Sequence, residues 1–207
     1  MQRLFPIFVK LAARRVLVVG AGAVGEGKIR GLLDTGARIR VVAPQATNTV
    51  REWAQAGAIA LEQRAFHVSD LENVFVVIAA TSSPAANKLI FAEARRRQIL
   101  CNVVDVPELC DFYYPAVVRR GDLQIAISTA GQSPSLARRL REQLERQFGP
   151  EYAAWVARLG KIRRDVLRSR LSPCQKKELL QSLAEGEPWR EAVRGQFEIP
   201  RHRGARR

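Results

Sequence analysis

Val16-Leu17-Val18-Val19-Gly20-Ala21-Gly22-Ala23-Val24-Gly25 joins an apolar run to a glycine-rich turn near the start of the chain, and residues 26–33 follow it with a helical pattern. A buried strand that feeds such a turn and then a helix directs backbone N–H groups and the positive end of the helix dipole at a pyrophosphate. The glycine spacing is G-x-G-x-x-G, in which the first glycine makes the tight turn, the second lets the phosphates approach and the third lets helix and strand pack closely. A purely structural turn is the alternative. The stretch predicts a dinucleotide site formed by Gly20, Gly22, Ala23, Val24 and Gly25.

The rest of the first half alternates apolar runs with helical patterns. We expect strands at residues 15–19, 39–43, 58–63, 75–80 and 100–104, helices at 24–35, 46–56 and 84–97, and a short turn at 69–72. Continuous runs rich in Val and Ile are typical of strands buried on both faces of a parallel sheet. Strands that alternate with helices favour an α/β fold of the Rossmann type, with a doubly wound parallel sheet.

The pattern changes after residue 105. Residues 116–120 and 123–128, joined around Arg120-Gly121-Asp122, predict a hairpin. A polar helix is expected to begin at Ser133-Pro134-Ser135 and to end near Phe148, and further helices follow from residue 151, with breaks at 172–173 and 186–188. We therefore expect a nucleotide-binding domain at 1–114, a connector at 115–149, a helical C-terminal domain at 150–200 and a disordered basic tail at 201–207.

The chain of 207 residues carries a formal net charge of +14. Nucleic-acid binding, an anionic small substrate and a general arginine bias of solvated surfaces would each account for this charge. No helix-turn-helix, zinc-finger or aromatic RNA-binding pattern accompanies the basic residues, so we expect no nucleic-acid partner.

The lengths of the apolar stretches and the pattern of cysteines indicate where in the cell the protein works. The apolar stretches are far shorter than the roughly 18–20 residues that cross a membrane, so we expect no membrane partner. Cys101, Cys110 and Cys174 show no C-x-x-C pairing and have no histidine neighbours. We therefore expect no metal site and no disulfide, and a reducing, cytoplasmic location.

In a doubly wound sheet, ligands bind outside the carboxyl ends of the strands. Pro44 and Gln45 follow the second expected strand, where an acidic residue would ordinarily bind the ribose, and they are the cofactor contacts we expect there. Thr81 and Ser82 follow the fourth expected strand. This hydroxyl-rich turn either caps the next helix or contacts the nicotinamide end of the cofactor.

Asp105 ends the fifth apolar run, Cys101-Asn102-Val103-Val104-Asp105. A carboxylate at the mouth of a buried strand faces the same crevice as the cofactor and can accept a proton there. A cap of the turn ahead of Pro107 is the alternative. Asp105 is the expected catalytic residue, and Asn102 is a further expected cofactor contact.

Several motifs occur in an order that resembles one known family. They are Leu4-Phe5-Pro6-Ile7-Phe8, Val18-Val19-Gly20-Ala21-Gly22-Ala23-Val24, Lys28, Ala79-Ala80-Thr81, Asn87, Cys101-Asn102-Val103-Val104-Asp105 and Ser133-Pro134-Ser135-Leu136-Ala137-Arg138. Over residues 1–185 the chain is similar to the precorrin-2 dehydrogenase and sirohydrochlorin ferrochelatase family, the N-terminal module of siroheme synthases. The resemblance implies NAD-dependent oxidation of precorrin-2 to sirohydrochlorin, with Asp105 as the acid/base.

The resemblance also implies a homodimer formed through the connector, and a tetrapyrrole polycarboxylate as substrate. The residues that it places near the substrate are Ser128, Thr129, Gly131, Ser133 and Arg138. Some members of the family also insert Fe²⁺ into sirohydrochlorin, and the resemblance leaves this second step open. An NAD-sensing regulatory Rossmann module without catalysis is the alternative function.

Overall fold

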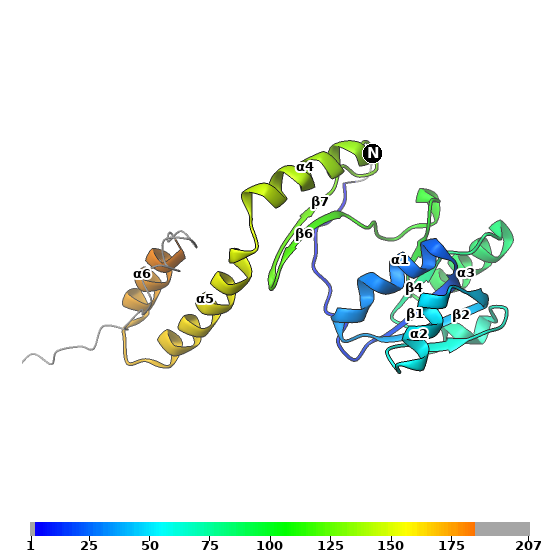
Figure 1. The fold of residues 1–207 in the computed structure, drawn as a ribbon, viewed down its shortest axis with the longest axis horizontal. Helices are drawn as coiled ribbons and strands as arrows, with labels where there is room; N and C mark the ends of the chain where they lie inside the picture. Colours follow the sequence, from blue (N-terminus) through cyan, green and yellow to red (C-terminus); the bar gives the residue numbers. More distant parts are fainter. Residues whose placement is uncertain (1–2, 185–207) are drawn as a thin grey trace, which may run out of the picture. The chain divides into compact units, whose positions relative to one another are not determined.

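The computed structural model describes residues 3–184. The chain divides into two compact units, the first up to Tyr114 and the second from Pro115. Figure 1 shows the elements of both units along the chain.

The first unit is built on a sheet whose strands all run parallel, in the order β3-β2-β1-β4-β5. The strands are β1 (Arg15–Ala21), β2 (Arg38–Ala46), β3 (Ala60–Glu62), β4 (Val76–Ala79) and β5 (Leu100–Val103). The order steps outward from β1 in both directions, so the predicted doubly wound Rossmann-type sheet is confirmed.

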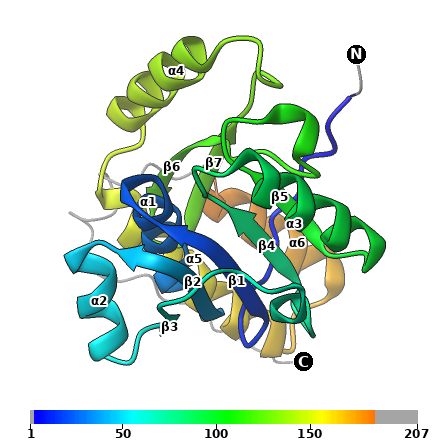
Figure 2. The same ribbon diagram turned by 90° about the vertical axis from the view of Figure 1, so that its right-hand side faces the viewer.

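Helices cover both faces of this sheet. They are α1 (Ala23–Leu32), α2 (Asn48–Gln55) and α3 (Pro84–Arg96), with short 3₁₀ turns η1 (Leu33–Thr35), η2 (Val68–Leu71) and η3 (Pro107–Leu109). Figure 2 shows α1 and α2 on one side of the sheet and α3 on the other. Alternate residues of β1 therefore enter different cores: Val18 packs with Ile29 of α1, and Leu17 packs with Ile90 of α3. Both faces of β1 are buried, which explains its uninterrupted apolar run.

The boundaries of β2, β3 and α1 are among those that differ from expectation. The second strand was expected to end at residue 43, but β2 extends to Ala46, so Pro44 and Gln45 lie within the strand. The third strand was expected at 58–63, but β3 covers only Ala60–Glu62 at the edge of the sheet. The first helix was expected to reach residue 35, but α1 ends at Leu32, and the chain leaves through η1 and Gly36, whose φ is +69°. A left-handed residue of this kind ends a helix, and glycine adopts it without steric cost.

The second unit begins with the expected hairpin of β6 (Ala116–Arg120) and β7 (Leu123–Ile127), which are antiparallel. Gly121 starts the two-residue turn with a φ of +57°, and a Cβ there would lie 3.2 Å from the Cβ of Ala153. Arg120 joins the hairpin to the next helix, because its guanidinium donates to the carbonyl oxygens of Phe148 (2.8 Å) and Glu145 (3.1 Å).

Three helices complete the second unit: α4 (Pro134–Gln147), α5 (Glu151–Arg168) and α6 (Pro173–Ala184). α4 and α5 contact the hairpin, and α5 packs on α6 through Ile162, Val166 and Leu183. The division into a connector and a helical domain stays a prediction. The expected break at 186–188 and the basic tail at 201–207 lie outside the described residues. Within residues 3–184, no helix is long and apolar enough to cross a membrane.

Candidate active site

The glycines of the loop between β1 and α1 differ in what surrounds them. Gly20 has a φ of +103°, and a Cβ there would overlap the carbonyl oxygen of Ala80 and lie 2.7 Å from its carbon. A Cβ at Gly25 would overlap the carbonyl oxygen of Gly20. At Gly22, by contrast, a Cβ would meet no atom within 4 Å. The first and third glycines therefore allow close packing, whereas the second borders open space from which a ligand can approach the backbone.

The first turn of α1 is open to an anion. Gly22 is the N-cap and lacks a side chain, and no side chain accepts a hydrogen bond from the start of the helix. The backbone N–H groups of the first turn and the positive end of the helix dipole are therefore directed at the space beside Gly22. Ala23, Val24 and Gly25 form this first turn, and their contact with the cofactor stays a prediction.

Two other loops leave the sheet beside the glycine loop. Ala80 N donates to Val19 O at 2.8 Å, and Val104 N donates to Ala79 O at 2.9 Å. These hydrogen bonds continue the ladders between β1, β4 and β5 beyond the strand ends. The turn that contains Thr81 and Ser82 and the loop that contains Asp105 therefore lie next to one another at the carboxyl edge.

Ser83, not Thr81, caps the helix that follows β4. The Ser83 hydroxyl accepts from Ala86 N at 3.3 Å. Thr81 Oγ1 donates instead to Asn87 Oδ1 at 2.7 Å, and Asn87 Nδ2 donates back to Thr81 O at 3.1 Å. Ser82 is exposed. The buried Asn87 side chain thus holds both the hydroxyl and the backbone carbonyl of Thr81 in place. Contact of Thr81 and Ser82 with the cofactor stays a prediction.

Asp105 is exposed and has a φ of +62°, a left-handed conformation that Asp tolerates better than most residues. Hydrogen bonds tie the loop around it to β5. Asp111 Oδ2 accepts from Cys101 N at 2.9 Å, and Asp111 N donates to Cys101 O at 2.8 Å. Cys110 Sγ donates to Val103 O at 3.1 Å. The carboxylate is thus held at a defined point of an anchored loop.

Asn102 also helps to tie the loop around Asp105 to β5. Its side chain is buried, and Nδ2 donates to Phe112 O at 2.8 Å and to Cys110 Sγ at 3.3 Å. The amide is therefore directed into the loop that carries Asp105. Contact between Asn102 and the cofactor stays a prediction.

Lys28, one of the residues that carry the family resemblance, has no role at the site predicted from the sequence. It follows Gly25 by one helical turn on α1, and its ammonium lies 3.9 Å from the centroid of the Tyr114 ring. Burial lowers the pKa of Lys28, and the negative charge of Asp105 opposes that shift. Burial also raises the pKa of the Tyr114 hydroxyl to about 12, although the residue as a whole is 44% exposed. The spacing between Gly25 and Lys28 could have identified Lys28 from the sequence, since residues three apart share a helix face.

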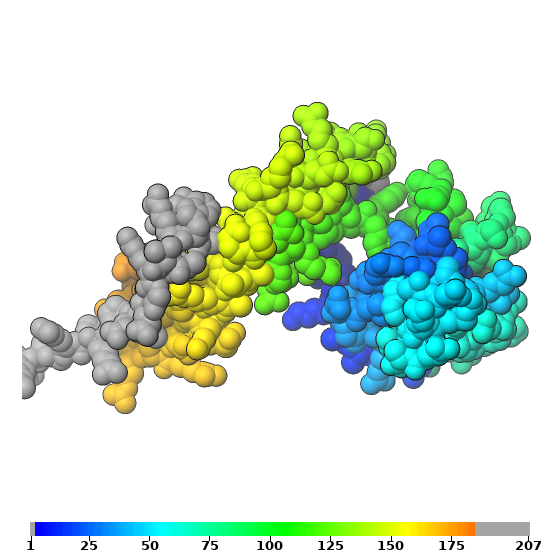
Figure 3. Space-filling view, in the orientation of Figure 1, coloured from blue at the N-terminus to red at the C-terminus, as the bar shows by residue number. Residues whose placement is uncertain are grey.

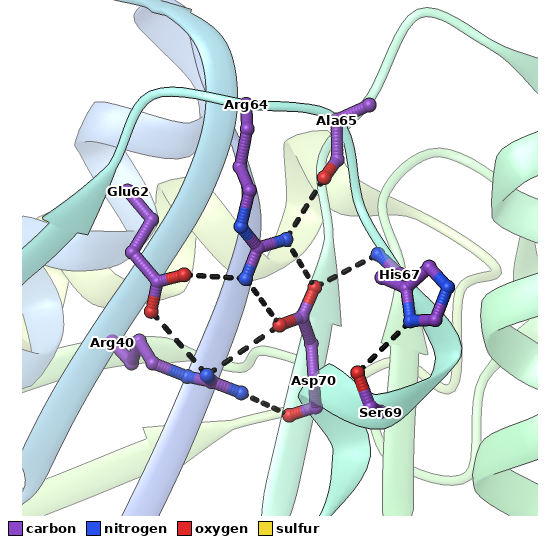
Figure 4. Close-up of polar contacts among 7 residues, drawn as sticks. All are labelled: Arg40, Glu62, Arg64, Ala65, His67, Ser69 and Asp70. Carbon is purple, nitrogen blue, oxygen red and sulfur yellow. Dashed lines mark hydrogen bonds and ion pairs between the residues drawn. The ribbon is translucent and has the colours of Figure 1, made fainter.

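Arginines near the second strand have structural partners. Arg40 lies in β2, and its guanidinium bonds to the Asp70 carbonyl and lies 3.3 Å from Glu62 Oε1 (Figure 4). Arg64 pairs with the buried Asp70 carboxylate at 2.6 Å. The Arg64 hydrogen bonds lower the pKa of Asp70, and the His67 N–H, which donates to Asp70 Oδ2 at 2.8 Å, acts in the same direction. This network joins β2, β3 and η2. Arg40 therefore has a structural role, because its guanidinium is paired within the network.

Pro44 and Gln45 are exposed near the end of β2. The backbone beside them is fixed by Arg51, whose Nη1 donates to Ala46 O at 2.6 Å. Contact of Pro44 and Gln45 with the cofactor stays a prediction.

One hollow of the first unit lies away from this edge. It measures about 660 Å³ and is lined by Arg15, Arg38, Gly57 and Asn73 among others, at the amino ends of β1 and β2. Ligands of doubly wound sheets bind at the opposite, carboxyl ends. We therefore assign the site to the glycine-loop edge.

The five residues expected at the substrate belong to the second unit. Ser128 Oγ accepts from Ala130 N at 3.1 Å, Thr129 Oγ1 accepts from Ser133 N at 3.1 Å, and Ser133 Oγ accepts from Leu136 N at 3.2 Å as the N-cap of α4. Gly131 has a φ of +81° in the same turn. Each hydroxyl keeps its own O–H as a donor. Arg138 is 78% exposed at its side chain and pairs with Glu142 at 3.1 Å.

No three His, Cys, Asp or Glu side chains among residues 3–184 gather closely enough to hold a metal ion. The cysteines are free thiols: Cys101 is buried, Cys110 is partly buried and Cys174 is exposed. Burial raises the pKa of the Cys101 thiol to about 12.

Comparisons with known proteins agree with this geometry. A family model described as "Putative NAD(P)-binding" matches residues 7–116, and one described as "Sirohaem biosynthesis protein central" matches residues 120–147. The solved structure of SirC, a precorrin-2 dehydrogenase, has a TM-score of 0.79 to this chain and is 30% identical, over 92% of this chain and 98% of that chain. The chain belongs to the precorrin-2 dehydrogenase and siroheme synthase family. The predicted resemblance is confirmed, and so is the NAD cofactor that the glycine loop indicates.

Curated members of this family are longer than the chain. The siroheme synthase of Ectopseudomonas mendocina is 39% identical over 95% of this chain and 40% of the relative. The siroheme synthase of Methylococcus capsulatus is 38% identical over 93% of this chain and 41% of the relative. The chain thus spans about two fifths of the length of these relatives.

Proposed function

We propose that this protein catalyses the NAD⁺-dependent oxidation of precorrin-2 to sirohydrochlorin. One observation carries the proposal. Asp105 is exposed on an anchored loop beside an open, glycine-lined helix N-terminus, in a chain that matches SirC, a precorrin-2 dehydrogenase, over 98% of the length of SirC.

The glycine loop fits a dinucleotide. The space at Gly22 admits a pyrophosphate to the backbone, whereas a side chain at Gly20 or Gly25 would collide with backbone atoms. The N–H groups of Ala23, Val24 and Gly25 would hold the phosphates. When bound, NAD⁺ accepts a hydride from the substrate. Thr81, Ser82 and the loop after β5 would border its nicotinamide end.

Asp105 supplies the proton acceptor. Oxidation of the macrocycle breaks a C–H bond as the hydride leaves, and a proton is released from the ring. The Asp105 carboxylate accepts this proton, because it is exposed and its loop holds it in place through Asn102, Cys110 and Asp111. The protein thereby positions the macrocycle against NAD⁺ and supplies one basic group, the Asp105 carboxylate.

The substrate carboxylates would be bound by donors of the second unit. Ser128, Thr129 and Ser133 each keep an O–H donor, and Arg138 offers a guanidinium suited to carboxylates.

We further propose a homodimer formed through the connector. The sheet of β6 and β7 has two strands within the described residues, so each strand has an unpaired edge that a second copy of the chain could extend. Leu136 of α4 is 44% exposed, so an apolar side chain is available for a partner.

The three free thiols support a reducing, cytoplasmic location.

Insertion of Fe²⁺ into sirohydrochlorin is a second proposed step, in which Fe²⁺ is a substrate. Pyrrole protons must leave as the metal enters, and Asp105 is the carboxylate that we expect to accept them.

Anaerobic incubation of the protein with precorrin-2 and NAD⁺, followed by absorbance spectroscopy, tests the first step. We expect NAD⁺-dependent formation of sirohydrochlorin, and Fe²⁺ added afterwards should give siroheme faster than in a protein-free control. NAD⁺ binding without turnover would contradict the proposal and favour the regulatory module.

A further inference from the structure

Lys28 is a half-buried cation whose charge has no paired anion. Within residues 3–184, its ammonium has no carboxylate oxygen within 4.0 Å and no hydrogen bond, and its contact is with the Tyr114 ring at 3.9 Å. A partly desolvated ammonium retains three N–H donors that require acceptors. The aromatic ring stabilises the positive charge on one side without using those donors.

The Asp105 carboxylate acts on this ammonium: burial lowers the pKa of Lys28, and the negative charge of Asp105 opposes that shift. Within residues 3–184, Lys28 and Asp105 nevertheless form no ion pair within 4.0 Å. The ammonium and the proposed catalytic carboxylate are therefore neighbours that do not neutralise each other. A substrate group bound by Lys28 would be placed beside Asp105.

Lys28 is poorly placed to bind the cofactor phosphates. It lies five residues beyond Ala23, the first residue of α1, which is about 7.5 Å along a helix axis. Its ammonium lies against the ring of Tyr114, on the loop after β5. The anion that it accepts is therefore expected on the Asp105 side of the site.

We propose that the Lys28 ammonium binds a peripheral carboxylate of the tetrapyrrole substrate next to Asp105, with the Tyr114 ring packed behind it. This inference rests on the proposed function, since it takes precorrin-2 as the substrate. Lys28 is then a substrate-binding residue on the first unit, in addition to the donors expected from the second. It fixes which part of the macrocycle faces Asp105.

The Lys28→Met variant tests this role, with Lys88→Met as matched control, because Lys88 is an exposed lysine of α3. A charge-assisted hydrogen bond lost on substrate binding should raise the KM for precorrin-2 about tenfold or more. The equilibrium Kd for sirohydrochlorin, measured without NAD⁺, should weaken similarly. The Kd for NAD⁺ should stay within about twofold, and Lys88→Met should change none of these values.

Lys28→Arg is the second variant and retains the positive charge, so its KM and its Kd for sirohydrochlorin should lie between those of wild type and Lys28→Met. Because Lys28→Met removes a half-buried charge that has no hydrogen bond, we expect its thermal midpoint to be unchanged or higher. Unchanged KM and sirohydrochlorin Kd in both Lys28 variants, with wild type active, would overturn this inference alone. An equal loss of NAD⁺ affinity would also overturn it, because it would place Lys28 at the cofactor. Inactive wild type that binds NAD⁺ would instead overturn the proposed function.

Discussion

Gly20 lies so close to Ala80 that a Cβ at position 20 would overlap the Ala80 carbonyl oxygen, and its φ of +103° is one that side chains rarely adopt. The glycine loop after β1 is thus in direct contact with the turn after β4. Gly22, two residues later, borders open space. The same motif therefore contains one glycine that packing requires and one that leaves the backbone open to the proposed ligand.

Alanine substitutions should separate these two roles. We expect Gly20→Ala to lower the free energy of unfolding by about 3 kcal/mol, through backbone strain and the collision with Ala80. Gly22→Ala should leave unfolding unchanged, because its φ is −74° and a Cβ would meet nothing within 4 Å, but it should weaken NAD⁺ binding about tenfold. Denaturant unfolding and calorimetric titration measure the two effects. Equal NAD⁺ affinity in Gly22→Ala would contradict the placement of the pyrophosphate.

Replacement of Asp105 by Asn should remove the proton acceptor and keep the backbone, since Asn also tolerates a φ of +62°. We expect turnover of precorrin-2 to fall by about a hundredfold or more, as general-base contributions of this size are common. The Kd for NAD⁺ should stay within about twofold. Single-turnover absorbance kinetics and NAD⁺ titration are the measurements. Wild-type turnover would remove Asp105 from the mechanism.

Asn102 should affect activity through the loop it anchors. Asn102→Ala removes the hydrogen bonds to Phe112 O and Cys110 Sγ and leaves the buried carbonyl without its donor, which should cost about 1–3 kcal/mol. We expect amide hydrogen exchange to increase in residues 104–114, with a lower kcat. An unchanged exchange rate in that loop would show that the other loop contacts suffice.

The Asp70 network predicts a specific acid sensitivity. Because Arg64 and the His67 N–H lower the pKa of Asp70, its ionised form stabilises the fold above the unfolded-state pKa of about 3.9. That stability should be lost as the pH falls from about 4 through the lower folded-state value. Asp70→Asn should cost about 2–3 kcal/mol at neutral pH and weaken this acid-induced loss. Glu72→Gln, at an exposed carboxylate two residues away, is the control, and an equal acid loss in Asp70→Asn and wild type would refute the assignment.

The proposed homodimer has a direct test. Light scattering during size exclusion should give twice the chain mass of 23.1 kDa. Leu136→Glu, on the exposed face of α4, should shift the mass toward that of one chain, because a buried charge at an interface is costly. A single-chain mass for wild type at micromolar concentration would contradict dimerisation.

The sequence alone determined the type of the first unit and predicted the edge of the sheet at which we propose the site. A strand buried on both faces must be apolar at every position. Gly20 and Gly25 stand where a Cβ would collide with backbone atoms, so composition and glycine spacing are sufficient signals for this unit. The hairpin and the helix starts at Pro84 and Pro134 were predictable for the same local reason: turn and cap residues act on their immediate neighbours.

The tertiary structure decided which side chains meet. Lys28 and Tyr114 lie far apart in the sequence, and their 3.9 Å contact exists only because α1 and the loop after β5 leave the same edge of the sheet. The sequence predicts Asn102 as a cofactor contact but does not identify the acceptors of its amide, Cys110 Sγ and Phe112 O, which only the fold of residues 104–114 reveals. Local spacing encodes strands, turns and caps, but contacts between distant segments depend on the three-dimensional arrangement that all strands form together.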